Sequence, residues 1–311
     1  MKHINIWVRL LTLVCFGILG GCVAVDKNNF PSPKVAPYPD TTKARTAVIS
    51  QLPLAGDSTI AFGNQKQVYF TNLSKPGTIF ISDSQTSNRN KVFIDLNEWI
   101  STPSDRVAQT AGITIDQSDR VLVAESGTGK LLRISSDARK LEVLADSYEG
   151  YKFSSVQALE IGSNGFCYLS SPDSGLIYCI DPDTGQVGLL NDRKLSPSCL
   201  LFDPQYDRLL VCEPESYRIS FFDLSEPSLP KTANILIDFF PQLVQPRGLA
   251  LDNDGLLYVS LGSLKKIVVY DLNLREEIKT INLDYEAERL AINDGFIYIG
   301  GDKLFSRIKL K

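Results

Sequence analysis

Acid–base or metal chemistry in this chain would have to use carboxylates, hydroxyls, amides or thiols, because its 311 residues include a single histidine, His3. Once a leader containing His3 is removed, catalysis with a histidine base and zinc or copper sites with histidine ligands are excluded. Oxygen ligands remain, and they suit calcium or magnesium. The formal net charge of −4 and the lack of a basic stripe argue against nucleic acid as a partner.

The N-terminus carries one cysteine with a specific chemical context. After a basic start, an apolar stretch over 10–19 is too short to span a bilayer but has the length of a signal-peptide core. It ends in Leu-Gly-Gly-Cys at 19–22, which resembles a bacterial lipobox in which the cysteine thiol carries the lipid. We therefore predict a lipoprotein signal peptide over 1–21 and lipidation, with palmitate, at Cys22. An ordinary secretory peptide with a chance cysteine is the alternative.

The segment 22–42 is polar and contains four closely spaced prolines, which oppose helix and sheet and favour an extended tether. A loop folded onto the following domain is the alternative. Val23 follows the cysteine, and this resembles lipoproteins that are sorted to the outer membrane. The expected location is the bacterial cell envelope, at the outer membrane facing the periplasm, with the lipid bilayer as one partner.

One pattern recurs through the predicted domain at 43–311: a short apolar strand, a turn, a second strand and then one or two more. First strands are expected at 60–62, 113–115, 159–161, 200–202, 249–251 and 290–292. Second strands are expected at 68–70, 121–123, 166–168, 209–211, 257–259 and 296–298. Turn signals such as Asn-Asp-Gly at 253–255 separate them. A period of roughly 40 to 50 residues with about four strands predicts an all-β, six-bladed β-propeller.

The last repeat supplies three strands before the chain reaches Lys311, while the apolar segment 46–52 has no blade of its own. We expect this N-terminal strand to complete the last blade. Such closure joins the two ends of the ring and removes an open sheet edge.

Inner strands line the axis of a propeller, so the residues at their ends should meet at the mouth of a central channel. Its charges would include Glu125, Glu213, Arg247, Glu288 and Arg289. Facing carboxylates such as Glu125 and Glu213 could bind a cation or do acid–base work. Alternatively, these charges only satisfy one another around a water-filled tunnel. The predicted ligand-binding mouth comprises Asp57, Glu125, Gln157, Ser198, Glu213 and Arg247.

The sequence of the repeats from about residue 54 onward resembles that of the gluconolactonase / senescence-marker-protein / luciferin-regenerating-enzyme family. The resemblance is clearest at 144–150, 197–204, 246–252 and 254–259. Other six-bladed propellers share these motifs, so they specify the fold better than the activity.

The resemblance implies one divalent cation on the axis, with an acidic ligand that also acts as base in opening a lactone. The four ligand positions fall at Asp57, Gln157, Ser198 and Glu213, where the family has Glu, Asn, Asn and Asp. None is identical, but all four keep an oxygen donor, which calcium or a similar cation would accept. Glu213 would be the catalytic base of a rebuilt pocket.

Four further cysteines lack metal-like spacing. A turn centred at 173 would place Cys167 opposite Cys179, and one centred between 205 and 206 would place Cys199 opposite Cys212. Directly opposed residues lie within disulfide range, so Cys167–Cys179 and Cys199–Cys212 are the predicted bridges. Buried free thiols are the alternative.

Two functions fit this sequence. One is an envelope lipoprotein whose propeller binds a small molecule or an envelope protein and keeps only a degenerate metal site. The other is a divalent-cation-dependent lactone or ester hydrolase, in which calcium or a similar ion is held by Asp57, Gln157, Ser198 and Glu213.

Overall fold

The computed structural model describes residues 47–50, 59–63, 67–71, 75–83, 91–100, 106–301 and 304–310. The predicted signal peptide (1–21), Cys22 and the tether (22–42) lie outside the described residues, as does Asp57. In the described ranges, no helix combines the length and the hydropathy of a membrane span.

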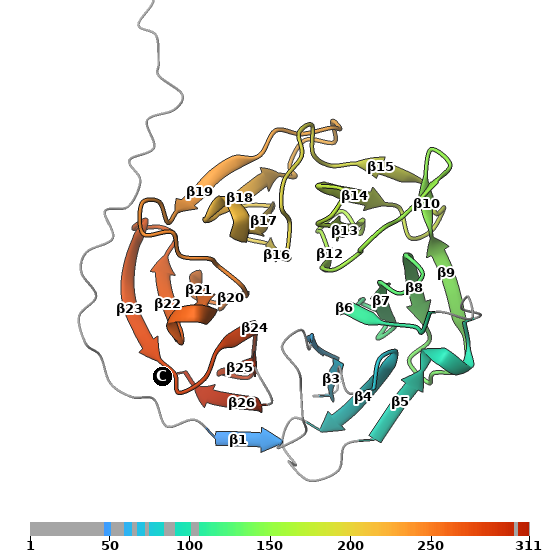
Figure 1. Ribbon diagram of the computed structural model, residues 1–311, viewed down its shortest axis with the longest axis horizontal. Coiled ribbons are helices and arrows are strands. Elements are labelled where there is room, and N and C mark those ends of the chain that lie inside the picture. The colour runs from blue at the N-terminus through green and yellow to red at the C-terminus, as the bar shows by residue number, and fades with distance from the viewer. Residues whose placement is uncertain are drawn as a thin grey trace, which may run out of the picture. The chain divides into compact units, whose positions relative to one another are not determined.

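Six four-stranded antiparallel sheets follow one another around a ring, with the first strand of each sheet innermost (Figure 1). The predicted six-bladed β-propeller is confirmed. Every expected first and second strand falls within, or within one residue of, a strand of the structure.

The strands are grouped into blades in chain order. Blade 1 contains β2 (Ile60–Phe62), β3 (Gln67–Thr71), β4 (Thr78–Asp83) and β5 (Lys91–Asp95). Blade 2 contains β6 (Thr110–Ile115), β7 (Val121–Glu125), β8 (Lys130–Ile134) and β9 (Leu141–Ala145). Blade 3 contains β12 (Leu159–Ile161), β13 (Cys167–Ser171), β14 (Leu176–Ile180) and β15 (Val187–Leu189).

The second half of the ring repeats this arrangement. Blade 4 contains β16 (Cys199–Asp203), β17 (Arg208–Glu213), β18 (Arg218–Asp223) and β19 (Asn234–Asp238). Blade 5 contains β20 (Leu249–Leu251), β21 (Leu256–Leu261), β22 (Lys266–Asp271) and β23 (Glu276–Asn282). Blade 6 contains β24 (Ala287–Asn293), β25 (Phe296–Gly301), β26 (Leu304–Lys309) and β1 (Ala47–Ser50).

The ring closes through blade 6, as predicted. Strand β1 pairs antiparallel with β26, with Ala47 opposite Arg307, and forms the outer edge of that blade (Figure 1). Blade 6 also packs against blade 1, where the rings of Tyr298 and Phe62 lie 4.7 Å apart. Residues from both ends of the chain are therefore needed for one sheet, which is how propellers protect their last edge.

The hairpins between first and second strands share a local device. Asp116, Asp203 and Asp252 each end or follow a first strand, and each carboxylate accepts hydrogen bonds from backbone amides of the turn that follows. Such side-chain bonds favour a tight turn over continued extension. The repeated Asp therefore sets the register of the two inner strands that line and support the channel.

The core lies between adjacent sheets. This explains why the second strands are nearly continuous apolar runs in the sequence. Every residue of β7 is buried, because blades cover both of its faces. Near the axis the strands approach so closely that a side chain does not fit. A Cβ at Gly112 would lie 2.4 Å from the carbonyl oxygen of Gln157, and one at Gly248 would lie 2.9 Å from that of Glu288.

A few elements decorate the ring. The hairpin β10 (Ser147–Tyr148) and β11 (Tyr151–Lys152) lies between blades 2 and 3. Single-turn 3-10 helices occur at η1 (Leu96–Glu98), η2 (Pro214–Ser216) and η3 (Gly262–Leu264). Both η2 and η3 directly follow second strands. They therefore belong to the loops at the end of the ring where the mouth was expected.

Candidate functional site

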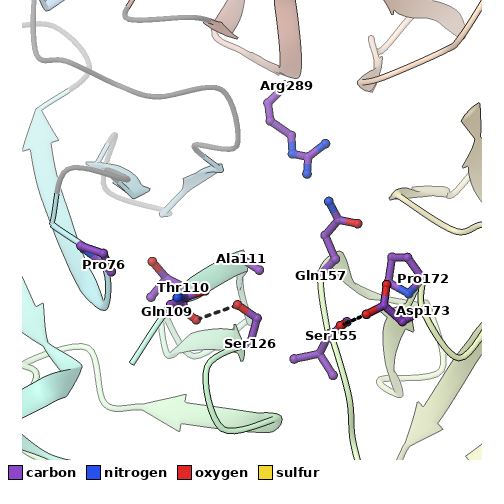
Figure 2. A pocket seen from close by; sticks show the side chains of 11 residues that line it. Pro76, Gln109, Thr110, Ala111, Ser126, Ser155, Gln157, Pro172, Asp173 and Arg289 are labelled. Atoms are coloured by element: carbon purple, nitrogen blue, oxygen red, sulfur yellow. Dashed lines mark hydrogen bonds between the residues drawn. The ribbon is translucent and has the colours of Figure 1, made fainter. Parts of the chain in front are cut away.

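A cavity of about 570 Å³ opens at the ends of the inner strands, chiefly over blades 2, 3 and 6 (Figure 2). We call it the mouth. Its lining comprises Pro76, Gln109, Thr110, Ala111, Ser126, Ser155, Val156, Gln157, Pro172, Asp173 and Arg289. This surface is rich in hydroxyl and amide groups, with one cation and one carboxylate.

A second cavity, of about 230 Å³, runs along the first strands of all six blades. We call it the channel. Ala111, Gln157 and Arg289 line both cavities, so the mouth and the channel meet at these three residues. Most of the channel wall is aliphatic, which makes its few polar side chains conspicuous.

Arg289 is the cation of the mouth. It lies on β24 at a register irregularity, and its guanidinium points across the cavity toward Gln157 (Figure 2). Its Nη1 makes only long contacts, of 3.4 Å each, to the carbonyl oxygens of Arg247 and Glu288. No carboxylate in the described part of the chain forms an ion pair with it. A guanidinium in this state retains most of its capacity to bind an added anion.

Gln157 faces Arg289 from the other side of the mouth. Its backbone amide donates to the carbonyl of Ser170 at 2.9 Å, which fixes the residue at the entrance to β12. Its side-chain amide points into the cavity (Figure 2). Nearby, the Ser155 hydroxyl donates to the carboxylate of Asp173, in the turn between β13 and β14. Of the predicted mouth residues, Gln157 is one that the structure places there.

Glu125 was expected at the mouth, and the structure corrects this. It is fully buried at the end of β7, and its carboxylate accepts from the backbone amides of Gln109, Gly127 and Thr128 at 2.8–2.9 Å. The Thr128 hydroxyl also donates to it. A carboxylate with this many donors organises the loop after its strand and presents no free oxygen to a ligand.

Glu213 is corrected in the same way. It is fully buried at the end of β17, where Arg218 donates to both of its oxygens at 3.0 Å in a two-pronged ion pair. The Ser220 hydroxyl donates to the carboxylate as well. Glu213 therefore ties β17 to β18 inside blade 4, and this geometry does not fit the predicted metal ligand or catalytic base.

The remaining predicted positions are scattered. The Ser198 hydroxyl oxygen is buried and has no hydrogen-bond partner in the described structure. Arg247 lies beside the mouth lining, where it donates to Gln245 at 2.9 Å and lies 3.9 Å from a Glu288 oxygen. Across the described ranges no three His, Cys, Asp or Glu side chains form a group that could hold a metal. The described members of the predicted calcium set do not fit a divalent cation.

Glu160 is a polar channel residue that the sequence analysis missed. It occupies β12 between Leu159 and Ile161, and it lines the channel. Burial raises the pKa of its carboxyl group to about 8, and the nearby Cys199 thiol contributes in the same direction. The available signal was an acidic residue in the middle of an apolar first strand, a position where the other first strands carry alanine, threonine or leucine.

The four described cysteines are free and buried. Cys199 lies directly opposite Cys212, as the predicted register requires. The predicted register for the other pair is wrong by one residue, because Cys167 lies opposite Ile180 and Tyr168 lies opposite Cys179. The turn there has four residues, 172–175, and Gly175 adopts a left-handed conformation. This shift turns Cys167 and Cys179 to opposite faces of blade 3, so the predicted bridge cannot form there.

Comparison with known proteins agrees with the six-bladed fold. Residues 152–291 match the family model described as SMP-30/Gluconolactonase/LRE-like region. A gluconolactonase of Zymomonas mobilis is 24% identical over 172 residues, which is 48% of each chain. The chain is a six-bladed β-propeller with a gluconolactonase-like region. It spans about half the length of the curated relatives that it matches.

Solved structures support the fold over nearly the whole ring of this gluconolactonase-like propeller. A gluconolactonase from Xanthomonas campestris superimposes with a TM-score of 0.69 at 17% identity, covering 89% of this chain and 99% of that one. A calcium-binding regucalcin from Agrobacterium tumefaciens gives a TM-score of 0.66 at 12% identity, covering 86% and 94%. At such identities the likeness extends to the fold and leaves the chemistry to the site.

Proposed function

We propose that this gluconolactonase-like propeller is a ligand-binding protein of the bacterial cell envelope, and that its mouth takes an anionic, hydroxyl-bearing small molecule such as a sugar acid. One observation carries the proposal. The guanidinium of Arg289 points into the mouth without forming an ion pair to any carboxylate of the described residues.

Arg289 supplies the charge recognition. A guanidinium offers several N–H donors in a planar fork that matches the two oxygens of a carboxylate. Arg289 is only partly exposed, so an ion pair to its guanidinium is stronger than one on an open surface. The long contacts to the two carbonyl oxygens hold the side chain near its position while leaving its donors available.

The rest of the lining suits hydroxyl groups. Gln157 and Gln109 bring side-chain amides, and Ser126 brings a hydroxyl, all from strand ends of blades 2 and 3. Asp173 adds a carboxylate that is already oriented by Ser155. Amides and carboxylates are the groups that bind the hydroxyls of sugars, and their spread over two blades would select a ligand with several of them.

A metal-dependent lactonase is the competing function, and the family likeness favours it. The arrangement of Glu213 counts against it, because its two oxygens are held by Arg218 and Ser220. The positive charge of Arg289 at the meeting point of mouth and channel would also repel a cation there.

Calorimetric titration of the purified full chain with gluconate, and with glucitol as the neutral match, tests the proposal. Gluconate should bind and glucitol should bind far more weakly. Arg289→Gln should weaken gluconate binding about 10- to 100-fold, the range expected for a hydrogen-bonded ion pair. Arg139→Gln makes the same charge change on a side chain that is 87% exposed, and it should leave the affinity unchanged. Equal binding of gluconate by both variants would refute the role of Arg289.

The hydrolase has its own readout. Acid release from glucono-1,5-lactone is followed with and without calcium, magnesium or zinc, against the spontaneous rate. The proposal expects no metal-dependent rate above that background. A calcium-dependent rate that Glu213→Gln abolishes, in a variant that remains folded, would establish the lactonase in its place.

The envelope location rests on the lipobox-like sequence that ends at Cys22. Cys22→Ser should block lipidation and move the protein from the membrane fraction to the soluble fraction. If the variant stays in the membrane fraction after a high-salt wash, the anchor is elsewhere.

A further inference from the structure

Two thiols lie opposite each other in the wall of the channel, below the mouth. Cys199 begins β16 and Cys212 lies directly opposite it on β17, and both belong to the same packed cluster between blades 4 and 5. Cys212 is fully buried, whereas Cys199 is 8% exposed and lines the channel. Cys199 is therefore the member of the pair that borders the channel, and Cys212 lies behind it.

We propose that Cys199 and Cys212 form a redox-active dithiol in the channel wall, which a small organic disulfide oxidises to a cross-strand disulfide. Directly opposed residues on antiparallel strands have Cα atoms about 4.5 to 5.5 Å apart, and disulfides bridge Cα atoms about 4.4 to 6.8 Å apart. The bond can thus form without moving either strand. This modification site does not depend on the ligand proposed for the mouth.

The pair is specific to blade 4. At the position of Cys212, blades 1, 3 and 5 carry Thr71, Ser170 and Ser260. Each of these hydroxyls accepts a hydrogen bond from the backbone amide of its partner on or just before the first strand, at 2.7–2.9 Å. Blades 2 and 6 carry Ala124 and Gly300 at the same position, so the scaffold needs only a small side chain here. A thiol in that place, opposite a second thiol, is a departure that the fold does not require.

The surroundings favour the thiolate of Cys199. A hydrogen bond from the Cys212 thiol, together with the positive charge of Arg289, lowers the pKa of Cys199 below its ordinary value. Burial and the same hydrogen bond raise the pKa of Cys212. Glu160 also lines the channel near Cys199, but burial raises the pKa of this carboxyl to about 8, which favours its neutral form at pH 7. Because Cys199 borders the channel and Cys212 lies behind it, Cys199 is the attacking sulfur and Cys212 the resolving one.

The reaction balances in two exchanges. The Cys199 thiolate attacks one sulfur of the reagent, whose S–S bond breaks, so that a mixed disulfide forms and one small thiolate leaves. The Cys212 thiol gives up its proton, and its sulfur attacks the Cys199 sulfur and expels the second small thiolate. Two protein thiols are oxidised, and one small disulfide is reduced to two small thiols.

Blade 3 supplies an internal control. Cys167 and Cys179 lie in different packed clusters, on opposite faces of that blade. Burial raises their pKa values to about 12 and about 11. Neither lines the mouth or the channel. They are buried cysteines of the same protein that should not react.

The test treats the native full chain with bis(2-hydroxyethyl) disulfide, quenches it with acid, alkylates it under denaturing conditions and maps it by mass spectrometry after trypsin. Cleavage after Lys194, Arg208 and Arg218 places Cys199 in peptide 195–208 and Cys212 in peptide 209–218. The expected product is a disulfide between these two peptides. Peptide 153–193, which holds both blade 3 cysteines, should be alkylated at both.

Two variants separate the attacking and resolving roles. Cys212→Ser introduces the side chain that blades 3 and 5 already carry at this position, and it should leave Cys199 as a stable mixed disulfide. Cys199→Ser should leave Cys212 unreacted. The proposal fails if the native chain yields no link between the two peptides, or if peptide 153–193 oxidises at the same rate. It also fails if Cys212 reacts as fast in the absence of Cys199.

Discussion

Two sets of polar side chains lie near the axis of this propeller, and they differ in what they are bonded to. At the ends of second strands, Glu125 and Glu213 are fully buried and hold several hydrogen bonds each. In the mouth and channel, Arg289, Gln157 and Glu160 face open space and form no ion pair with one another. The carboxylates that look most functional in the sequence are structural, and the charged group that lines the mouth without an ion pair to a described carboxylate is Arg289.

The difference is one of available bonding capacity. A buried carboxylate must be neutralised or hydrogen-bonded to be tolerated, so its presence inside a blade predicts partners. The guanidinium of Arg289 lines the mouth and is only partly buried, so water can hydrate it and a ligand can replace that water. Stability should therefore depend on the first set, and ligand affinity on the second.

The largest expected effect is on the first set. Glu213→Ala leaves Arg218 and Ser220 without their acceptor, and it should lower the free energy of unfolding by about 3 kcal/mol. That value is the lower end for a buried pair, because the Arg218 side chain is 31% exposed and can recover hydration. Urea denaturation followed by circular dichroism measures it.

Glu215→Ala is the matched control, because Glu215 lies two residues away on η2 and is exposed. It should change stability by less than about 0.5 kcal/mol. If Glu213→Ala is as mild as the control but loses ligand or metal binding, Glu213 belongs to the site after all and the comparison between the two sets collapses.

The fold could be predicted because its signals are local and repeated. Each blade needs two apolar inner strands joined by a turn, and residues such as Asp252 and Gly255 are typical of such a turn in the sequence. Closure could be predicted as well, since segment 46–52 was an apolar strand without a blade. The register at Cys167 could not be predicted, because the sequence at 172–175 is compatible with a turn of three or of four residues. The conformation of Gly175 decides between them.

The site was harder to predict because the sequence does not show where a side chain finds its partner. Glu213 and Arg218 are five residues apart, a separation that brings them opposite each other only once β17 and β18 are paired. A check of whether the cross-strand neighbour of each charged strand residue carries the opposite charge would have identified this pair in advance. In the same check, Glu160 and Arg289 have no neighbour of opposite charge, since they lie opposite Tyr168 and Gly300. They would therefore have remained as candidates for the site.

The second set offers a test of pH dependence. Burial raises the pKa of Glu160 from 4.5 to about 8, so the unfolded chain ionises this group while the folded chain still holds the proton. Its contribution to stability is fully present below about pH 4.5 and is lost as the pH rises to about 8. Glu160→Gln has no such proton, so it should be more stable than the parent at pH 9, by about 2 kcal/mol after allowing for screening by channel water.

Melting curves at pH 4, 7 and 9 measure this difference. The gap between Glu160→Gln and the parent should widen with pH and stop widening above about pH 8, the pKa of the carboxyl. Parallel curves across this range would show that Glu160 is solvated like a surface residue, and the contrast between bonded and unbonded polar groups would then not extend to the channel.

The smallest expected effect is that of Cys212→Ser, and it separates the two cysteine-bearing blades. Cys212→Ser places a hydroxyl where blades 3 and 5 have Ser170 and Ser260. Those two hydroxyls accept hydrogen bonds from backbone amides at 2.9 and 2.7 Å. The amide of Cys199 occupies the corresponding position, so this substitution should change the free energy of unfolding by no more than about 0.5 kcal/mol.

Cys167→Ser is the comparison in blade 3. It buries a hydroxyl among apolar side chains, including Leu122 and Leu169, and should lower the free energy of unfolding by about 1 to 3 kcal/mol. Paired urea titrations decide the matter: equal losses in the two variants would mean that the position of Cys212 does not offer the hydrogen bond seen in its sister blades.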